Sequence, residues 1–200
     1  SPLIFSLEGK SHDILATERL LLNILSHLSG ISTHTNKIVR IAKKVNPNVE
    51  ILATRKTLPG LRDIEKRAVV HGGGATHRMR LDDAILIKDN HLKLSKNIKK
   101  SIEISRSKYP NLMVEVEADN EQQAIEIAKN GADRVMLDNF SPDEATATIR
   151  KLREISDIEI EISGGVTIEN IASYAKKADF ISLGSLTMSS LPVDFSLHVL

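Results

Sequence analysis

One stretch of the chain, residues 54–91, concentrates side chains that could bind a charged ligand. Three consecutive glycines, 72–74, lie in it between two groups of cations. Its cations and histidines include Arg55, Lys56, Arg62, His71, His77, Arg78, Arg80, Lys88 and His91. Arginine offers a planar fork that matches carboxylate or phosphate, and glycine lets the backbone approach a ligand closely. The combination predicts a site for a small, multiply charged anion rather than a solvated basic loop.

The composition of the chain excludes several classes of protein and of functional site. Of the 200 residues 41% are apolar and 26% charged, and the net charge of +1 predicts no general attraction to nucleic acid or membranes. The absence of cysteine excludes disulfides, thiolate catalysis and zinc–sulfur sites, and is typical of a cytoplasmic protein. No apolar run reaches the roughly 18 residues of a membrane span, and no signal peptide is expected. The length fits one domain with a sizeable core.

Two helices are expected before residue 46. The first runs from Thr17 to Ser29 and ends at Gly30, and the second covers about 35–45 and ends before Asn46 and Pro47. The apolar stripe of the first helix consists of Leu20, Leu21, Ile24, Leu25 and Leu28. Residues 1–10 are expected to form a short strand.

Six short apolar runs follow, and helix-like segments separate them. The runs are 49–53, 84–87, 112–116, 134–137, 158–162 and 180–183. Strands and helices that alternate in this way predict a parallel sheet with right-handed crossovers. Six units exceed a small doubly wound sheet and fall short of the eight of a closed barrel. The predicted fold class is therefore α/β, an incomplete or open (β/α) barrel preceded by a short helical segment.

Each predicted strand ends in distinctive polar or glycine residues, and in a barrel these carboxyl ends converge on one face. The first half of the predicted ring is cationic. The second half carries two carboxylates, Glu117 and Asp138, and two glycine-rich turns at 163–165 and 184–185. A glycine-rich turn that opens a helix binds phosphate on backbone amides. The carboxylates could equally hold Mg²⁺ or accept hydrogen bonds from ribose hydroxyls.

Several motifs resemble those of the quinolinate phosphoribosyltransferase family. They are TRKT at 54–57, HGGGATHRMRLDDAILIKDNH at 71–91, VEVE at 114–117, MLDN at 136–139 and ISGG at 162–165, with a similar helical segment at 16–33. The resemblance runs from about residue 14 to the end. It implies a pentosyltransferase of the type II phosphoribosyltransferase kind. Such an enzyme transfers phosphoribosyl from PRPP to the ring nitrogen of quinolinate with loss of CO₂. The products are nicotinate mononucleotide and pyrophosphate, on the route to NAD.

The resemblance also implies a role for individual residues. Quinolinate would be bound by Arg55, His77, Arg78, Lys88 and, from a neighbouring subunit, Arg19. PRPP would be bound by Lys56, Glu117, Asp138, Ser163, Gly164, Gly165, Gly184 and Ser185. Glu117 and Asp138 would also be ligands of Mg²⁺. The expected partners are the two small molecules and further copies of the chain, in a homodimer or higher homo-oligomer with shared active sites. Neither nucleic acid nor a membrane is expected to bind.

Two departures from the family pattern keep alternatives open. Residues 1–13 are expected to be a remnant of the family's N-terminal α/β sandwich domain, with the catalytic barrel and its leading helices over 14–200. Met188 stands where the family usually has a histidine, so one contact to pyrophosphate is missing or replaced. The alternatives are a nicotinate-type phosphoribosyltransferase, a barrel enzyme for another sugar phosphate, and a non-catalytic paralogue or assembly partner.

Overall fold

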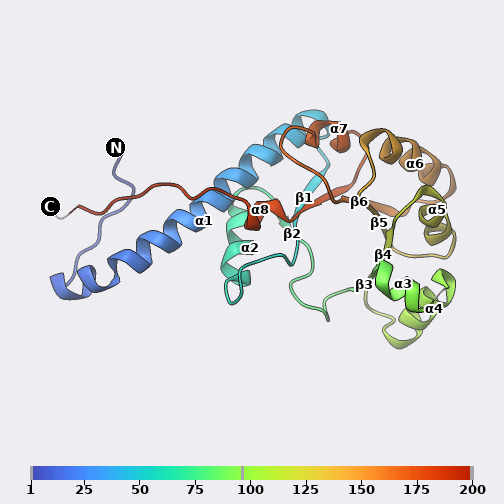
Figure 1. Ribbon diagram of the computed structural model, residues 1–200, viewed down its shortest axis with the longest axis horizontal. Coiled ribbons are helices and arrows are strands. Elements are labelled where there is room, and N and C mark those ends of the chain that lie inside the picture. Colours follow the sequence, from blue (N-terminus) through green and yellow to red (C-terminus); the bar gives the residue numbers. More distant parts are fainter. Residues whose placement is uncertain (1, 96, 199–200) are drawn as a thin grey trace.

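A parallel sheet of seven strands organises the protein, in a computed structural model that describes residues 2–95 and 97–198. The strand order is β2-β1-β7-β6-β5-β4-β3, and helices lie outside the curved sheet (Figure 1). The strands are β1 Glu50–Ala53, β2 Ala75–Thr76, β3 Ile85–Ile87, β4 Val114–Ala118, β5 Arg134–Asp138, β6 Glu159–Ser163 and β7 Phe180–Leu183. Across the described residues β2 and β3 do not pair with each other, so the barrel stays open. The predicted incomplete barrel is confirmed, with β2 as a seventh strand that the sequence did not reveal.

Eight helices accompany these strands within the described ranges. They are α1 Ser11–Val45, α2 Arg62–His71, α3 Asp89–Ser95, α4 Ile98–Lys108, α5 Glu121–Lys129, α6 Pro142–Ile155, α7 Ile171–Ala175 and α8 Ser185–Met188. Ser141 begins α6 with a reciprocal capping box to Glu144, as the SPDE sequence predicts. The expectation that the 163–165 turn opens a helix is wrong. The amide of Thr167 bonds to Asn170 Oδ1 at 2.7 Å, and this turn delays the start of α7 to Ile171.

The two faces of the sheet differ in chemistry because side chains alternate along each strand. Leu137, Ile162 and Ile181 are in register across β5, β6 and β7 and are fully buried in the apolar core. The residue before each of the first two, Met136 and Glu161, is also in register and points to the opposite, concave face. That face also carries Glu117, the register partner of Met136. The inside of the open barrel is therefore lined with charged groups that must find partners or ligands.

A single helix, α1, replaces the two helices predicted before the barrel. Gly30 does not end it. This glycine is buried, and a Cβ there would collide with the backbone of Leu191, so the absence of a side chain lets the C-terminal segment cross the helix. The amide of Val193 bonds to the Ser26 carbonyl at 3.0 Å. The position needs glycine for close packing and not as a helix stop.

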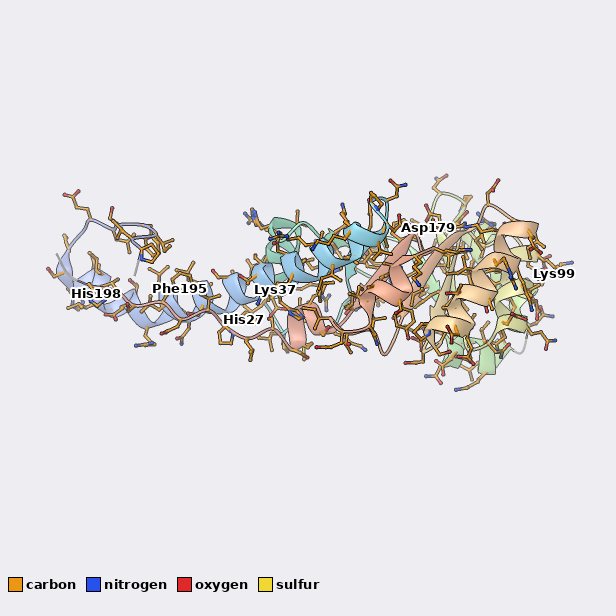
Figure 2. All side chains as sticks on the ribbon, turned by 90° about the horizontal axis from the view of Figure 1, so that it is seen from above. His27, Lys37, Lys99, Asp179, Phe195 and His198 are labelled. Atoms are coloured by element: carbon orange, nitrogen blue, oxygen red, sulfur yellow. The ribbon has the colours of Figure 1, made fainter. Side chains whose placement is uncertain are left out.

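The N-terminal half of α1 projects away from the barrel (Figure 1). Residues 2–10 form no strand, so the predicted strand over 1–10 is wrong for the described part of that range. The predicted apolar stripe is not buried in one chain, since Leu20 is 65% and Ile24 38% exposed. Figure 2 shows Phe195 and His198 of the C-terminal segment beside this projecting half, at the opposite end from Lys99. None of the described helices is both long and apolar enough to span a bilayer.

Candidate active site

Two arginines on the β1–β2 side of the site form no ion pair with any carboxylate of the described residues. Arg55 follows β1 and Arg78 follows β2, and the Nε atoms of both are buried without a hydrogen-bond partner in the described part of the chain. One further contact of Arg78 is a donation from its guanidinium to the Ala84 carbonyl at 3.3 Å. Burial lowers the pKa of Arg78, and the charge of Arg55 lowers it further. Two like charges are thus held close together, an arrangement that an anionic ligand would stabilise.

The acidic side of the site pairs its charges more fully. Glu117 at the end of β4 accepts a hydrogen bond from Lys88 Nζ at 2.6 Å, and the Glu117 side chain is almost fully buried. Asp138 at the end of β5 accepts from Asn139 Nδ2 at 2.7 Å. Burial raises the pKa of Asp138, and the neighbouring Glu117 carboxylate raises it further. Lys56 and Lys88 oppose this rise, so two carboxylates and two lysines share one region.

Both glycine-rich turns lie against this region. Gly164 and Gly165 have φ values of +81° and +64°, which other residues rarely adopt, and a Cβ at Gly164 would collide with Asn139. At the second turn, a Cβ at Gly184 would lie 2.9 Å from Lys56 Cδ. The Thr187 hydroxyl of α8 donates to the Lys56 carbonyl. The predicted phosphate turns therefore border the predicted PRPP lysine.

His77 connects the two sides through a buried acidic pair. Its Nε2 lies 2.8 Å from Glu115 and 3.3 Å from Glu161, and Arg134 reaches Glu161 at 3.3 Å. Burial of the ring lowers its pKa, but the hydrogen bonds to Glu115 and Glu161 outweigh this and raise it to about 9. The Arg78 amide donates to Nδ1 at 2.8 Å, which a doubly protonated ring could not accept. The raised pKa favours a second proton on the ring, and the ring can take it up only if the Arg78 contact breaks.

Two charged neighbours on α2 were missed at the sequence level. Glu65 is fully buried, accepts the Leu58 amide at 3.2 Å and contacts His27 Nε2 of α1 at 2.7 Å. Lys66 is 1% exposed and donates to the carbonyls of His77 and Arg78. A Glu-Lys pair in a helix usually indicates a solvated face. The one signal against this was spacing, because Glu65 precedes the apolar Ala68 and Val69 by three and four residues.

The remaining candidates support loops or lie apart. Arg62 donates to Thr57 Oγ1 and to the Met79 carbonyl, and His91 Nδ1 accepts the Lys88 amide at 2.9 Å. Arg19 is exposed in the N-terminal half of α1, and Figure 1 shows that this half of the helix projects away from the barrel of its own chain. The structure thus gathers every predicted site residue except Arg19 at the carboxyl ends of the strands. His71 and Met188 are exposed.

Comparison with known proteins identifies a protein family that matches most of the chain. Residues 31–198 match the family described as Quinolinate phosphoribosyl transferase, C-terminal domain. The chain belongs to the quinolinate phosphoribosyltransferase family. It is 45% identical to the probable nicotinate-nucleotide pyrophosphorylase [carboxylating] of Archaeoglobus fulgidus, over 99% of this chain and 78% of that protein. Identity to the human nicotinate-nucleotide pyrophosphorylase [carboxylating] is 36%, over 98% of this chain and 67% of the relative.

Solved structures of the family agree with the fold. NadC from Streptococcus pyogenes superposes with a TM-score of 0.87 at 39% identity, covering 94% of this chain and 65% of that one. The chain thus spans slightly less than two thirds of that structure. A nicotinate-nucleotide pyrophosphorylase from Francisella tularensis gives a TM-score of 0.86 at 37% identity. The resemblance read from the sequence motifs is confirmed at the level of family and fold.

Proposed function

We propose that the protein transfers phosphoribosyl from PRPP to the ring nitrogen of quinolinate, with release of pyrophosphate and CO₂ and formation of nicotinate mononucleotide. The observation that carries this proposal is the pair of arginines, Arg55 and Arg78, whose buried Nε atoms have no partner among the described residues. Lys88, which donates to Glu117, adds a third cation at the carboxyl ends of the strands. A ligand with two carboxylates supplies the charge that this side lacks. Pyridine monocarboxylates supply half of it and would leave a cation unpaired.

In this reaction the bond from ribose C1′ to the pyrophosphate oxygen breaks, and the pyridine nitrogen bonds to C1′. No side chain has to attack. Lys56, held between the 184–185 turn and Thr187, neutralises the leaving pyrophosphate, while Arg55 and Arg78 hold the pyridine in line. Alkylation makes the ring nitrogen cationic. The electron pair of the bond to the 2-carboxylate then flows into the ring as CO₂ leaves, and a proton from solvent replaces it on C2.

Glu117 and Asp138 fit Mg²⁺, and we include this ion as cofactor in the proposal. Hard oxygen ligands suit it. Burial raises the pKa of Asp138 and the Glu117 carboxylate raises it further, so a cation bound by both groups would favour their ionised forms. When bound together with PRPP, the ion would offset charge on the pyrophosphate. The same carboxylates can accept hydrogen bonds from the ribose hydroxyls. Because the proposed substrates are metabolites of the cytoplasm, we place the reaction there.

The function is tested by mixing the protein with PRPP, Mg²⁺ and quinolinate labelled in the 2-carboxylate. Labelled CO₂ and nicotinate mononucleotide should appear in equal amounts. A parallel reaction with nicotinate distinguishes the monocarboxylate alternative, because that substrate should turn over far more slowly. Failure of both reactions, with the protein folded, would favour the non-catalytic alternative that Met188 leaves open.

We also propose a homo-oligomer in which Arg19 completes the site of a neighbouring subunit. Arg19 is exposed on the projecting half of α1, and the apolar Leu15 and Leu20 nearby are 58% and 65% exposed. Burial of these side chains against a second copy would stabilise the contact. Inactive Arg19→Ala and Lys88→Ala proteins should recover activity when mixed, because a mixed dimer contains one intact site. Subunit exchange, followed with tagged chains, is the control. Exchange without recovered activity would contradict the shared site.

A further inference from the structure

Lys66 is the largest fully buried side chain of the described residues, with 1% exposure. Within residues 2–95 and 97–198 it forms no ion pair with a carboxylate. Its ammonium group donates to two backbone carbonyls, of His77 at 3.1 Å and of Arg78 at 2.6 Å. A buried ammonium without a counter-ion is costly. A lysine kept in this state calls for an explanation beyond packing.

Besides Lys66, a few hydrogen bonds hold the segment of His77 and Arg78, among them Arg62 to the Met79 carbonyl and the Arg78 amide to His77 Nδ1. It follows β2, a two-residue strand at the edge of the sheet, so the ladder ends just before Arg78. Amide contacts that fix it are His77 to the Ala53 carbonyl at 3.3 Å, and Met79 and Arg80 to one Asp83 oxygen. Lys66 therefore anchors the two peptide units that carry the His77 and Arg78 side chains.

Charges face Lys66 from every element around it. Arg62 lies on α2 itself, Arg55 follows β1, and Arg78 and Asp83 lie in the segment after β2. Burial lowers the pKa of Lys66 to about 8, with Arg62, Arg55 and Arg78 acting in the same direction and Asp83 against it. The cationic side of the site thus contains one member that can lose its charge near neutral pH.

We propose that Lys66 is a positioning residue for the dicarboxylate: its ammonium fixes Arg78 for the ligand, and the bound dianion keeps that ammonium protonated. This inference rests on the proposed function. A nearby anion favours the charged form of a lysine, so the pKa of Lys66 is higher in the complex than in the free protein. Above about pH 8 the free protein has lost the proton and the complex retains it. Quinolinate binding should therefore take up a proton there, and affinity should fall as pH rises.

Titration calorimetry with quinolinate tests this in two buffers of different ionisation enthalpy, at pH 7 and at pH 8.5. The protein is compared with Lys66→Met, Lys66→Arg and the control Arg67→Met, which removes an exposed charge from the next position of α2. Lys66→Met should bind quinolinate at least about tenfold more weakly at pH 7, with PRPP binding unchanged. Arg67→Met should match the parent protein. Lys66→Arg keeps the charge but does not titrate in this range, so its proton uptake at pH 8.5 should be smaller than that of the parent.

The outcomes distinguish failure of the proposed function from failure of the proposed role of Lys66. A parent protein that binds no quinolinate overturns the proposed function, and this inference with it. If the parent binds and Lys66→Met binds equally well, Lys66 has no positioning role. If the Lys66→Met melting curve shows an unfolded protein, the arginine variant decides the matter. Equal proton uptake in Lys66→Arg and the parent then assigns the proton to another group, such as His77, and overturns the proposal.

Discussion

The two sides of the open barrel hold their buried charges in opposite ways. On the β4–β6 side, Glu161 contacts His77 and Arg134, and Glu117 contacts Lys88. On the β1–β2 side, Lys66 and Arg78 donate to backbone carbonyls, and no described carboxylate forms an ion pair with either. Carbonyl dipoles can hold a cation but do not neutralise it. The buried carboxylates of the acidic side are therefore paired with cations inside the folded chain, although Glu115 Oε1 and Glu161 Oε1 have no hydrogen-bond partner among the described residues. The cations of the other side gain their counter-charge when an anion binds.

This difference predicts that damage on the cationic side affects activity more than stability. Arg78→Ala should lower kcat/KM for quinolinate by about 10²–10³-fold, because loss of one partner of a desolvated charge contact costs about 3–4 kcal/mol. PRPP binding should stay nearly unchanged. Steady-state kinetics with each substrate varied measures both effects.

The control for this variant is Arg80→Ala, which removes an exposed arginine two residues along the same segment. It should leave both constants close to those of the parent. Equal loss of quinolinate and PRPP binding in Arg78→Ala would show that the segment has collapsed, and the assignment of Arg78 to the dicarboxylate would be wrong.

At the buried ion pairs of the acidic side, damage should appear first as lost stability. Glu161→Gln leaves Arg134, which also stacks on Phe180 at 3.7 Å, with a neutral partner in a buried position. Breaking a buried ion pair costs about 3–5 kcal/mol, so we expect the melting temperature to fall by roughly 10 °C. Glu159→Gln is the matched control, because Glu159 contacts the same arginine at 2.7 Å from the half-exposed end of the strand. It should change the free energy of unfolding by less than about 1 kcal/mol.

Two variants test whether the carboxylates Glu117 and Asp138 of the acidic side bind PRPP. Glu117→Gln and Asp138→Asn should each weaken PRPP binding in Mg²⁺ by about tenfold, with quinolinate binding spared. Asp138→Asn should be at least as stable as the parent. Its raised pKa means that the ionised form destabilises the free protein at pH values above that pKa, and asparagine removes the repulsion from Glu117. Unchanged PRPP affinity in both variants would make these carboxylates purely structural.

Sequence patterns predicted the part of the site that is built from the carboxyl ends of the strands. The apolar runs located six of the seven strands, and the motifs at their carboxyl ends placed Arg55, Lys88, Glu117 and Asp138 on one face. The seventh strand, β2, escaped because its two residues, Ala75 and Thr76, follow three glycines and form no apolar run. Gly30 was read as a helix stop because close packing against Leu191 leaves no trace in local sequence.

The burial of Glu115, Glu161 and Lys66 was not predicted, for a different reason. Glu115 and Glu161 alternate with apolar residues in β4 and β6, a pattern typical of strands with one solvated face. Curvature of the sheet turns that face inward, where both side chains are buried. Lys66 looked like an ordinary helix-surface lysine, because its acceptors are carbonyls, which every residue has. A side chain that bonds to backbone carbonyls cannot be recognised from the residue types around it in the sequence.

We infer that the cations of the β1–β2 side, which form no ion pair with a described carboxylate, bind the two carboxylates of quinolinate. Equilibrium binding of quinolinate and of nicotinate to the unmodified protein, at pH 7 and equal ionic strength, tests it most directly. Because nicotinate leaves one buried charge without a partner, we expect quinolinate to bind about 100-fold more tightly or better. Equal affinity for the two pyridines would contradict the claim.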